Sequence, residues 1–140
     1  MSVEEEVRDA AAALVADFGS GRVEAYFDRL ASDATFVFHT SPDRLASRAA
    51  YRAQWRRWED EDGFRVLACA SSNVHVHVLG PDAAVLAHDV ETRIATTAGQ
   101  EDVRERETIV FARREGRWLV VHEHLSQAPA TPDEAAQAER

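Results

Sequence analysis

The stretch Trp118-Leu-Val-Val-His-Glu-His-Leu-Ser126 decides how the chain folds. It is apolar at its start and polar at its end, and it follows the turn-forming segment Arg113-Arg-Glu-Gly-Arg117. Such a run predicts a β-strand, in which successive side chains point to opposite faces. One face then carries Trp118, Val120, His122, His124 and Ser126, and the other carries Leu119, Val121, Glu123 and Leu125. A strand that begins with Trp and ends with two imidazoles indicates a pocket wall, apolar at the bottom and polar at the mouth.

The segments that precede this strand share its period of two. From Phe64 onward the pattern predicts four strands, at residues 64–79, 83–97, 101–114 and 117–126. Short turn segments separate them, namely Gly80-Pro-Asp82, Ala98-Gly-Gln100 and Glu115-Gly116. Short connections join antiparallel neighbours, so these four strands are predicted to form a meander.

The first half of the chain has helical periodicity instead. Residues 3–18 predict an amphipathic helix that Gly19 ends. Ser20 is predicted to cap a second helix, whose buried stripe is Val23, Tyr26, Phe27 and Leu30. A short strand is expected at residues 35–39.

A third helix is predicted from Ser47 to Asp60, with Tyr51, Trp55 and Trp58 on its inward face. The acidic cluster at residues 59–62 is expected in solvent beyond its last turn, because negative charge at a helix C-terminus is unfavourable. Three helices around one strand, followed by a meander, predict an α+β fold. A strongly curved, mostly antiparallel sheet covered by helices forms a cone with a cavity inside.

Composition narrows the class of protein. The chain has 140 residues, of which 45% are hydrophobic and 29% charged, and this composition predicts one globular domain. The domain is expected to span residues 1–128. Residues 129–140 are rich in Ala, Pro and acidic residues and are expected to form a mobile or short helical tail. A net charge of −9 argues against nucleic acid or an anionic membrane as partner. A cytoplasmic location is expected, because the N-terminus is acidic, Cys69 is the only cysteine and no apolar run approaches about 18 residues.

The order of these elements resembles the nuclear-transport-factor-2-like superfamily, and specifically its SnoaL-like members. The segment Glu107-Thr-Ile-Val-Phe-Ala-Arg-Arg-Glu-Gly-Arg-Trp-Leu-Val-Val-His-Glu-His-Leu-Ser126 resembles the closing hairpin of that group. It also resembles the end of the association domain of calcium/calmodulin-dependent kinase II. The resemblance implies a conical, cystatin-like α+β fold with helices on the curved sheet. It leaves function open, because the fold is used by isomerases, cyclases, dehydratases and non-catalytic binding domains.

The hairpin suggests a candidate acid/base pair. If Glu115-Gly116 is a two-residue turn, Ile109 faces His122 and Glu107 faces His124. A carboxylate beside an imidazole makes a general acid/base pair, so His124 and His122 are candidate catalytic residues with Glu107 orienting them. A bulge would shift the pairing by one residue and present Arg106 and Thr108 instead, making an anion pocket.

Five further residues are predicted to line the ligand pocket: His39, Trp55, His88, Thr92 and Ile109. The inward orientation of His88 and Thr92 is implied by the resemblance. His122 and His124 could also chelate a metal, which would need a third and a fourth ligand such as Glu107, His88 or His39. No metal and no cofactor is expected.

The sequence thus predicts a pocket for a small, partly apolar molecule, with proton transfer that would isomerise, cyclise or dehydrate it. Tyr26 and Tyr51 are expected in the core, which leaves the pocket without the tyrosine-based oxyanion hole of ketosteroid isomerases. The alternative is a non-catalytic ligand-binding or oligomerisation module. A homodimer through the outer sheet face is expected, because Leu119, Val121 and Leu125 would otherwise leave an apolar patch in water.

Overall fold

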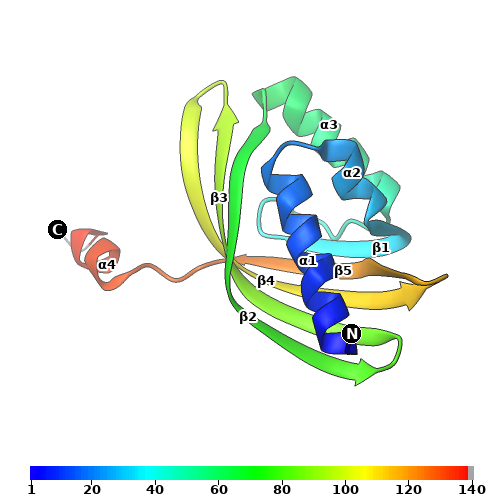
Figure 1. The fold of residues 1–140 in the computed structure, drawn as a ribbon. Coiled ribbons are helices and arrows are strands. Elements are labelled where there is room, and N and C mark those ends of the chain that lie inside the picture. The colour runs from blue at the N-terminus through cyan, green and yellow to red at the C-terminus, as the bar shows by residue number, and fades with distance from the viewer. Residues whose placement is uncertain (139–140) are drawn as a thin grey trace.

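The computed structural model describes residues 1–138 as three helices on one side of a single curved sheet, with a fourth helix apart from it near the C-terminus (Figure 1). The helices are α1 (Val3–Gly19), α2 (Val23–Asp28), α3 (Arg48–Asp62) and α4 (Pro132–Ala138). The strands are β1 (Leu30–Phe38), β2 (Arg65–Gly80), β3 (Ala83–Thr96), β4 (Gly99–Arg114) and β5 (Arg117–Gln127). The α+β fold and the meander of four long strands are confirmed. No helix in the described part of the chain is long and apolar enough to cross a membrane.

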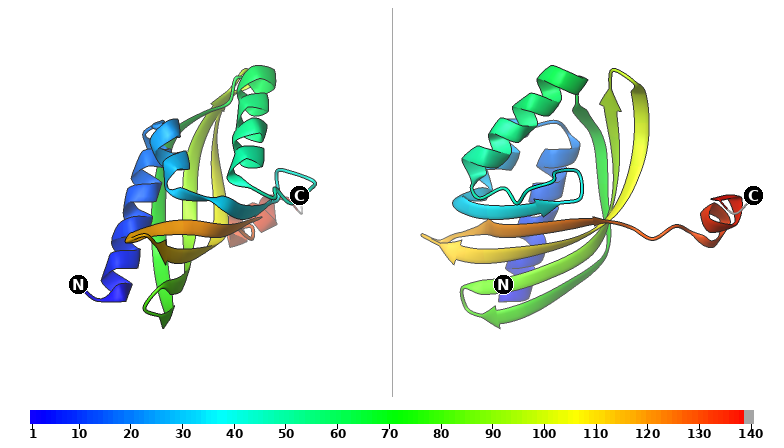
Figure 2. Two further views of the ribbon diagram at one scale, coloured as in Figure 1. Left: turned by 90° about the vertical axis from the view of Figure 1, so that its right-hand side faces the viewer. Right: turned by 180° about the vertical axis from the view of Figure 1, so that it is seen from behind.

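The five strands lie in the order β1-β5-β4-β3-β2, so β5 joins the N-terminal strand to the meander. The three pairs within the meander are antiparallel, and β1 runs parallel to β5. The sheet bends strongly, and α1, α2 and α3 cover its concave side (Figure 2). Irregular pairing between Ser72 and His75 contributes to the bend, because a bulge increases local twist.

Strand β1 is longer than predicted. It begins at Leu30 rather than at residue 35, and the Asp33-Ala34 pair does not interrupt it. Leu30 pairs with Val120 of β5, and the Val120 N–H donates to the Arg29 carbonyl over 3.0 Å. Pairing with β5 therefore holds Leu30 in extended backbone, and the prediction that it belongs to a helical stripe is wrong.

The helix ends follow from identifiable caps. Ser47 begins α3, where its hydroxyl accepts the Ala50 N–H over 3.0 Å. The predicted cap of the second helix is wrong, because Ser20 closes α1 by donating to the Ala16 carbonyl over 2.7 Å. Helix α3 runs to Asp62, and the acidic cluster lies inside its last turn because Gly63 supplies the left-handed C-cap, with φ of 63°.

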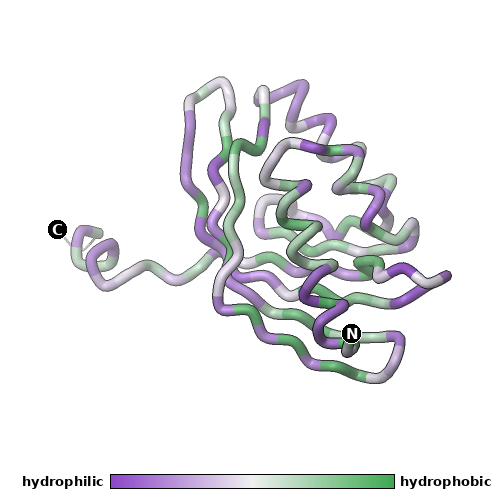
Figure 3. The backbone as a smooth tube through the Cα atoms, in the orientation of Figure 1, coloured by the Kyte–Doolittle hydropathy of each residue, from purple (hydrophilic) through white to green (hydrophobic). Residues whose placement is uncertain are grey.

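The core lies between α1 and the concave face of the sheet. The backbone of β2 and β3 near their connecting turn is mostly hydrophobic where α1 crosses it (Figure 3). The largest fully buried apolar side chains come from α1 and from β1, β3, β4 and β5: Val7, Phe36, Leu86, Ile109, Phe111, Leu30 and Val120. This packing fixes which face of each strand points into the cone.

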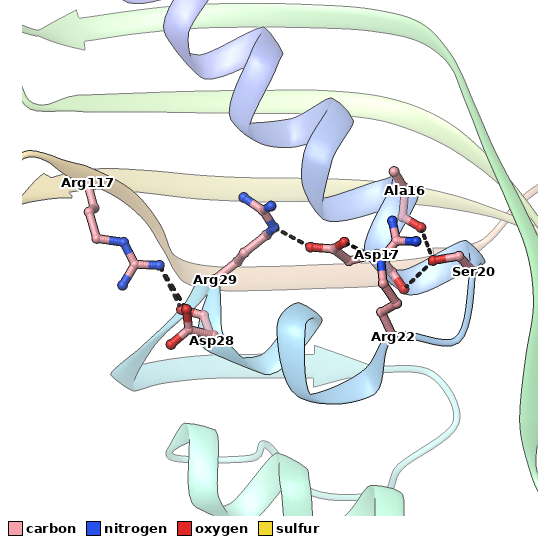
Figure 4. Close-up of polar contacts among 7 residues, drawn as sticks. All are labelled: Ala16, Asp17, Ser20, Arg22, Asp28, Arg29 and Arg117. Carbon is pink, nitrogen blue, oxygen red and sulfur yellow. Dashed lines mark hydrogen bonds and ion pairs between the residues drawn. The ribbon is translucent and has the colours of Figure 1, made fainter.

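One buried carboxylate ties the helices to the sheet edge. Asp17 of α1 is only 6% exposed and binds two arginines, with Arg29 at 2.6 Å and Arg22 at 2.9 Å (Figure 4). The hydrogen bond from Arg29, aided by Arg22, holds the pKa of Asp17 below its usual value despite desolvation. A buried acid with this many partners serves the structure.

Asp17→Asn should lower the free energy of unfolding by about 2 kcal/mol, because a charge-assisted hydrogen bond is lost while the arginines remain. The pKa is lowered in the folded state, so this contribution is present above the usual value of 3.8 and is lost as pH falls through the folded pKa. Urea titrations at neutral and acidic pH measure the difference. Asp9→Asn, an exposed position on α1, is the matched control, and an equal loss in both variants would contradict the role of Asp17.

Candidate functional site

A bulge in β5 decides which side chains enter the cone. Next to the turn the register is as predicted, with Arg114 opposite Arg117 and Phe111 opposite Val120. Beyond that point the pairing shifts by one residue, so that Val110 lies opposite His122. The unpaired residue is Val121. Every side chain that follows it therefore lies on the face opposite to the one expected from simple alternation.

The predicted Glu107–His124 pair is consequently wrong. Thr108 lies opposite His124, and Glu107 lies opposite Leu125. His122 and His124 are on the outer, convex face, where the His122 Nδ1 lies 2.7 Å from the Thr35 Oγ1. Glu123, which was predicted to face outward, is 2% exposed and points into the cone.

The interior of the cone contains a cavity of about 380 Å³. The three N-terminal helices supply an aromatic wall, and the strands supply the opposite wall. The aromatic residues that line the cavity are Phe18, Tyr26, Phe38, Tyr51, Trp55, Trp58 and Phe64. The polar strand residues that line it are Cys69, Thr92, Thr96, Glu105, Glu107 and Glu123. A mostly apolar cavity with a few convergent polar groups is the usual form of a small-molecule site.

Two tyrosine hydroxyls meet the Glu123 carboxyl group inside this cavity. The Tyr26 and Tyr51 oxygens are 3.0 Å apart, and the Tyr26 hydroxyl donates to Glu123 Oε2 over 3.5 Å. Burial raises the pKa of both tyrosines and of Glu123, and the charge of Glu107 raises the pKa of Glu123 further. The three groups are therefore held in their neutral, proton-bearing forms. Their hydroxyls were predicted to be core groups only.

Glu107 makes the second polar contact of the site. Its Oε1 lies 2.7 Å from His88 Nε2, and His88 Nδ1 lies 2.6 Å from the Ser71 hydroxyl. Burial, followed by repulsion from Glu105, raises the pKa of Glu107 to about 8. Burial lowers the pKa of His88. Both shifts favour a neutral carboxyl group donating to a neutral imidazole.

The other predicted pocket residues lie at different depths. Trp55 and Thr92 line the cavity, and His88 faces inward behind Glu107. His39 follows β1 at the rim, where its Nε2 lies 2.5 Å from Glu105. Ile109 is fully buried in the core and does not line the cavity. Their roles in binding stay predictions.

A second depression, of about 490 Å³, lies on the outer face of the sheet. Its lining includes Arg106 and Thr108, which the shifted register was predicted to present as an anion pocket, together with His124 and His75. Asp89 lies in the same depression and opposes an anion there. Among residues 1–138, no three His, Cys, Asp or Glu side chains are placed to hold a metal ion.

The raised pKa of Glu107 predicts that stability falls as pH rises. The unfolded carboxyl group releases its proton near the usual value of 4.5, whereas the folded one keeps it until about 8, so the folded state binds more protons between these values. Glu107→Gln is neutral at every pH and preserves a donor toward His88. When the pH is raised from about 5 to about 8.5, the free energy of unfolding should therefore fall less in Glu107→Gln than in the parent protein.

Denaturant titrations at both pH values measure this difference. Glu101→Gln, an exposed position on the same strand, is the control and should behave like the parent. Identical pH dependence of the parent and Glu107→Gln would show that Glu107 ionises normally in the folded protein.

The fold matches solved structures from several bacteria and one nematode. A structure described as a putative calcium/calmodulin-dependent protein kinase II association domain from Xanthomonas campestris superimposes with a TM-score of 0.77. It is 23% identical, and the match covers 94% of this chain and 91% of that one. The association domain of the kinase from C. elegans gives a TM-score of 0.68 at 22% identity, covering 89% of this chain and 95% of that one. At this identity the likeness establishes the fold alone.

Among curated sequences, calcium/calmodulin-dependent protein kinase type II of Caenorhabditis briggsae is 38% identical over 60 residues, which is 42% of this chain. The matched segment is 11% of the kinase, so it spans a small part of that relative. The family model of the SnoaL-like domain matches residues 7–131, which includes every helix and strand of the cone except the first residues of α1. The chain therefore belongs to the SnoaL-like domain family.

Proposed function

We propose that the cone cavity binds a small, partly apolar molecule and that Glu107 exchanges a proton with it. The observation that carries the proposal is a carboxyl group with a pKa of about 8, held by His88 inside an aromatic cavity. A group whose pKa lies close to neutrality serves well as a general acid or base. The reactions that such a site suits are isomerisation, cyclisation and dehydration.

The tyrosine pair supports the same chemistry from the other side of the cavity. Tyr26 and Tyr51 hold their protons, and their hydroxyls lie beside Glu123. Neutral donors in a dry site stabilise the charge that develops on a substrate oxygen when a neighbouring carbon loses a proton. Glu107 as base and the tyrosines as donors therefore form a complete proton-transfer site.

This proposal assigns no catalytic role to His122 and His124. Both lie on the outer face of β5, away from the cavity, and His122 is bonded to Thr35. The imidazole that contacts the acid is His88, which is a positioning residue because it acts through Glu107.

Proton abstraction can be tested with a nitrobenzisoxazole, an aromatic carbon acid whose ring opening is driven by a general base and followed by absorbance. The rate should rise through about pH 8 as Glu107 loses its proton. Glu107→Gln should reduce the rate by about 100-fold or more, the usual contribution of a positioned base. His124→Ala should leave it unchanged.

Two results would count against the assignment. A rate that survives in Glu107→Gln excludes this carboxyl group as the base, and a rate that falls only in His124→Ala moves the chemistry to the outer face. Fluorescence of Trp55 and Trp58, which line the cavity, reports binding independently of turnover.

A second candidate function is an oligomerisation module, which the likeness to kinase association domains favours. The outer face of the sheet carries half-buried apolar residues, including Val85, Val110 and Leu119. A homodimer through this face would cover them. The prediction that Leu119, Val121 and Leu125 share this outer face is wrong for Leu125. Leu125 lines the inner cavity and cannot contact a partner subunit.

Val110→Arg places a charge at the centre of the outer face and should convert an oligomer to monomer. Native mass spectrometry of the parent and the variant measures subunit number. Gln100→Arg, an exposed position at the β3–β4 turn, adds the same charge elsewhere and should leave the mass unchanged. A parent that is already monomeric, or an oligomer that survives Val110→Arg, would contradict assembly through this face.

A further inference from the structure

We infer that the molecule bound in the cavity carries a positively charged nitrogen on an apolar or aromatic body. The inference rests on the proposed function, because it takes the cavity to be a small-molecule site. It adds the charge of the ligand, which neither the family nor the solved structures specify.

The cavity is lined by acidic side chains alone among the charged types. Glu105, Glu107 and Glu123 lie on its strand wall, and Asp62 lies at the exposed end of α3 that borders it. No arginine or histidine of residues 1–138 lines the same space. Glu107 and Glu123 hold their protons in the empty cavity, and either can supply a negative charge by releasing its proton when a cation enters.

The hydrogen bonding of Glu123 is a second observation, independent of which charged side chains line the cavity. It is 2% exposed and faces the cavity, yet its carboxyl group has one long contact, 3.5 Å from the Tyr26 hydroxyl. Buried carboxylates normally have close hydrogen-bond partners. The 3.5 Å contact with Tyr26 lies at the outer limit of a hydrogen bond, so Glu123 departs from this rule.

Asp17 is a buried acid with a structural role, and its partners can be compared with those of Glu123. Asp17 has Arg29 at 2.6 Å and Arg22 at 2.9 Å, and its pKa is held low. Glu123 has comparable burial and no arginine. The cation that would balance Glu123 is therefore absent from the cavity wall, and a ligand can supply it.

The aromatic wall suits such a ligand. Tyr26, Tyr51, Trp55 and Trp58 line the cavity together with the acids. A cation over an aromatic face gains electrostatic attraction from the ring, and the gain grows when the site excludes water. The remaining apolar walls would contact the body of the molecule, and about 380 Å³ admits one aromatic group with a short amine chain.

Binding of a cation would be coupled to proton release. The empty cavity holds protons on its buried acids, because burial and mutual repulsion raise their pKa. A ligand charge placed beside these groups favours their ionised form. A proton then leaves as the cation enters.

The test is calorimetric titration at neutral pH with matched probes that differ only in charge. Tryptamine and phenethylamine are the cations, tryptophol and phenylethanol are the neutral counterparts, and indole-3-propionate and phenylpropionate are the anions. Each amine should bind roughly tenfold or more tightly than its alcohol, and the acids should bind more weakly than either. Buffers of different ionisation enthalpy should reveal release of about one proton per amine.

Glu123→Gln and Glu107→Gln should each bring the affinity for the amine close to the affinity of the same variant for the alcohol. Glu101→Gln is the control and should keep the full preference. Circular dichroism and thermal unfolding check that each variant is folded, and Glu105→Gln replaces either one that is not.

Three outcomes would contradict the inference, and they differ in what they say about the proposed function. Alcohols or acids that bind as tightly as amines would overturn the cationic ligand while supporting the cavity as a binding site. Amine preference that persists in the glutamine variants would place the cation elsewhere. Failure of all six probes to bind would count against both the proposed function and this inference.

Discussion

The whole molecule depends on how β5 is paired. This strand pairs with β1 in parallel on one side and with β4 antiparallel on the other, so it joins the helical half of the chain to the meander. The bulge at Val121 lies within it and reverses the facing of the residues that follow. Without that shift His122 and His124 would enter the cone and Glu123 would leave it. One unpaired residue therefore sets the chemistry of the cavity.

The cavity is lined by buried acidic groups, and no arginine of residues 1–138 lines it to balance them. Asp17 is buried with two arginines and serves the packing of α1, whereas within residues 1–138 Glu107 is bonded to His88 and Glu123 to Tyr26, with no arginine at either. Burying unpaired acids costs folding free energy, and such costs concentrate at functional sites. The contrast between Asp17, which two arginines bind, and Glu123, which has one long contact, is the reason that we propose a ligand-binding role for Glu123.

Membership in the SnoaL-like family accounts for the cone and leaves its contents open. The likeness to kinase association domains has the same limit, because at 22–23% identity it establishes the fold alone. The acids and tyrosines that line the cavity are the basis of the proposed proton-transfer site and of the proposed cationic ligand.

The sequence by itself determined that three helices precede an antiparallel meander of four strands, and it determined the two-residue turn at Glu115-Gly116, because periodicity and turn chemistry are local. It also marked Trp55, Thr92, His88 and Glu107 as inward candidates. Only the tertiary structure decided the extended backbone at Leu30 and the bulge at Val121, because both arise from pairing between strands distant in sequence. Alternation along β5 pointed to the histidines, and the packing of the sheet brought Glu123 into the cavity instead.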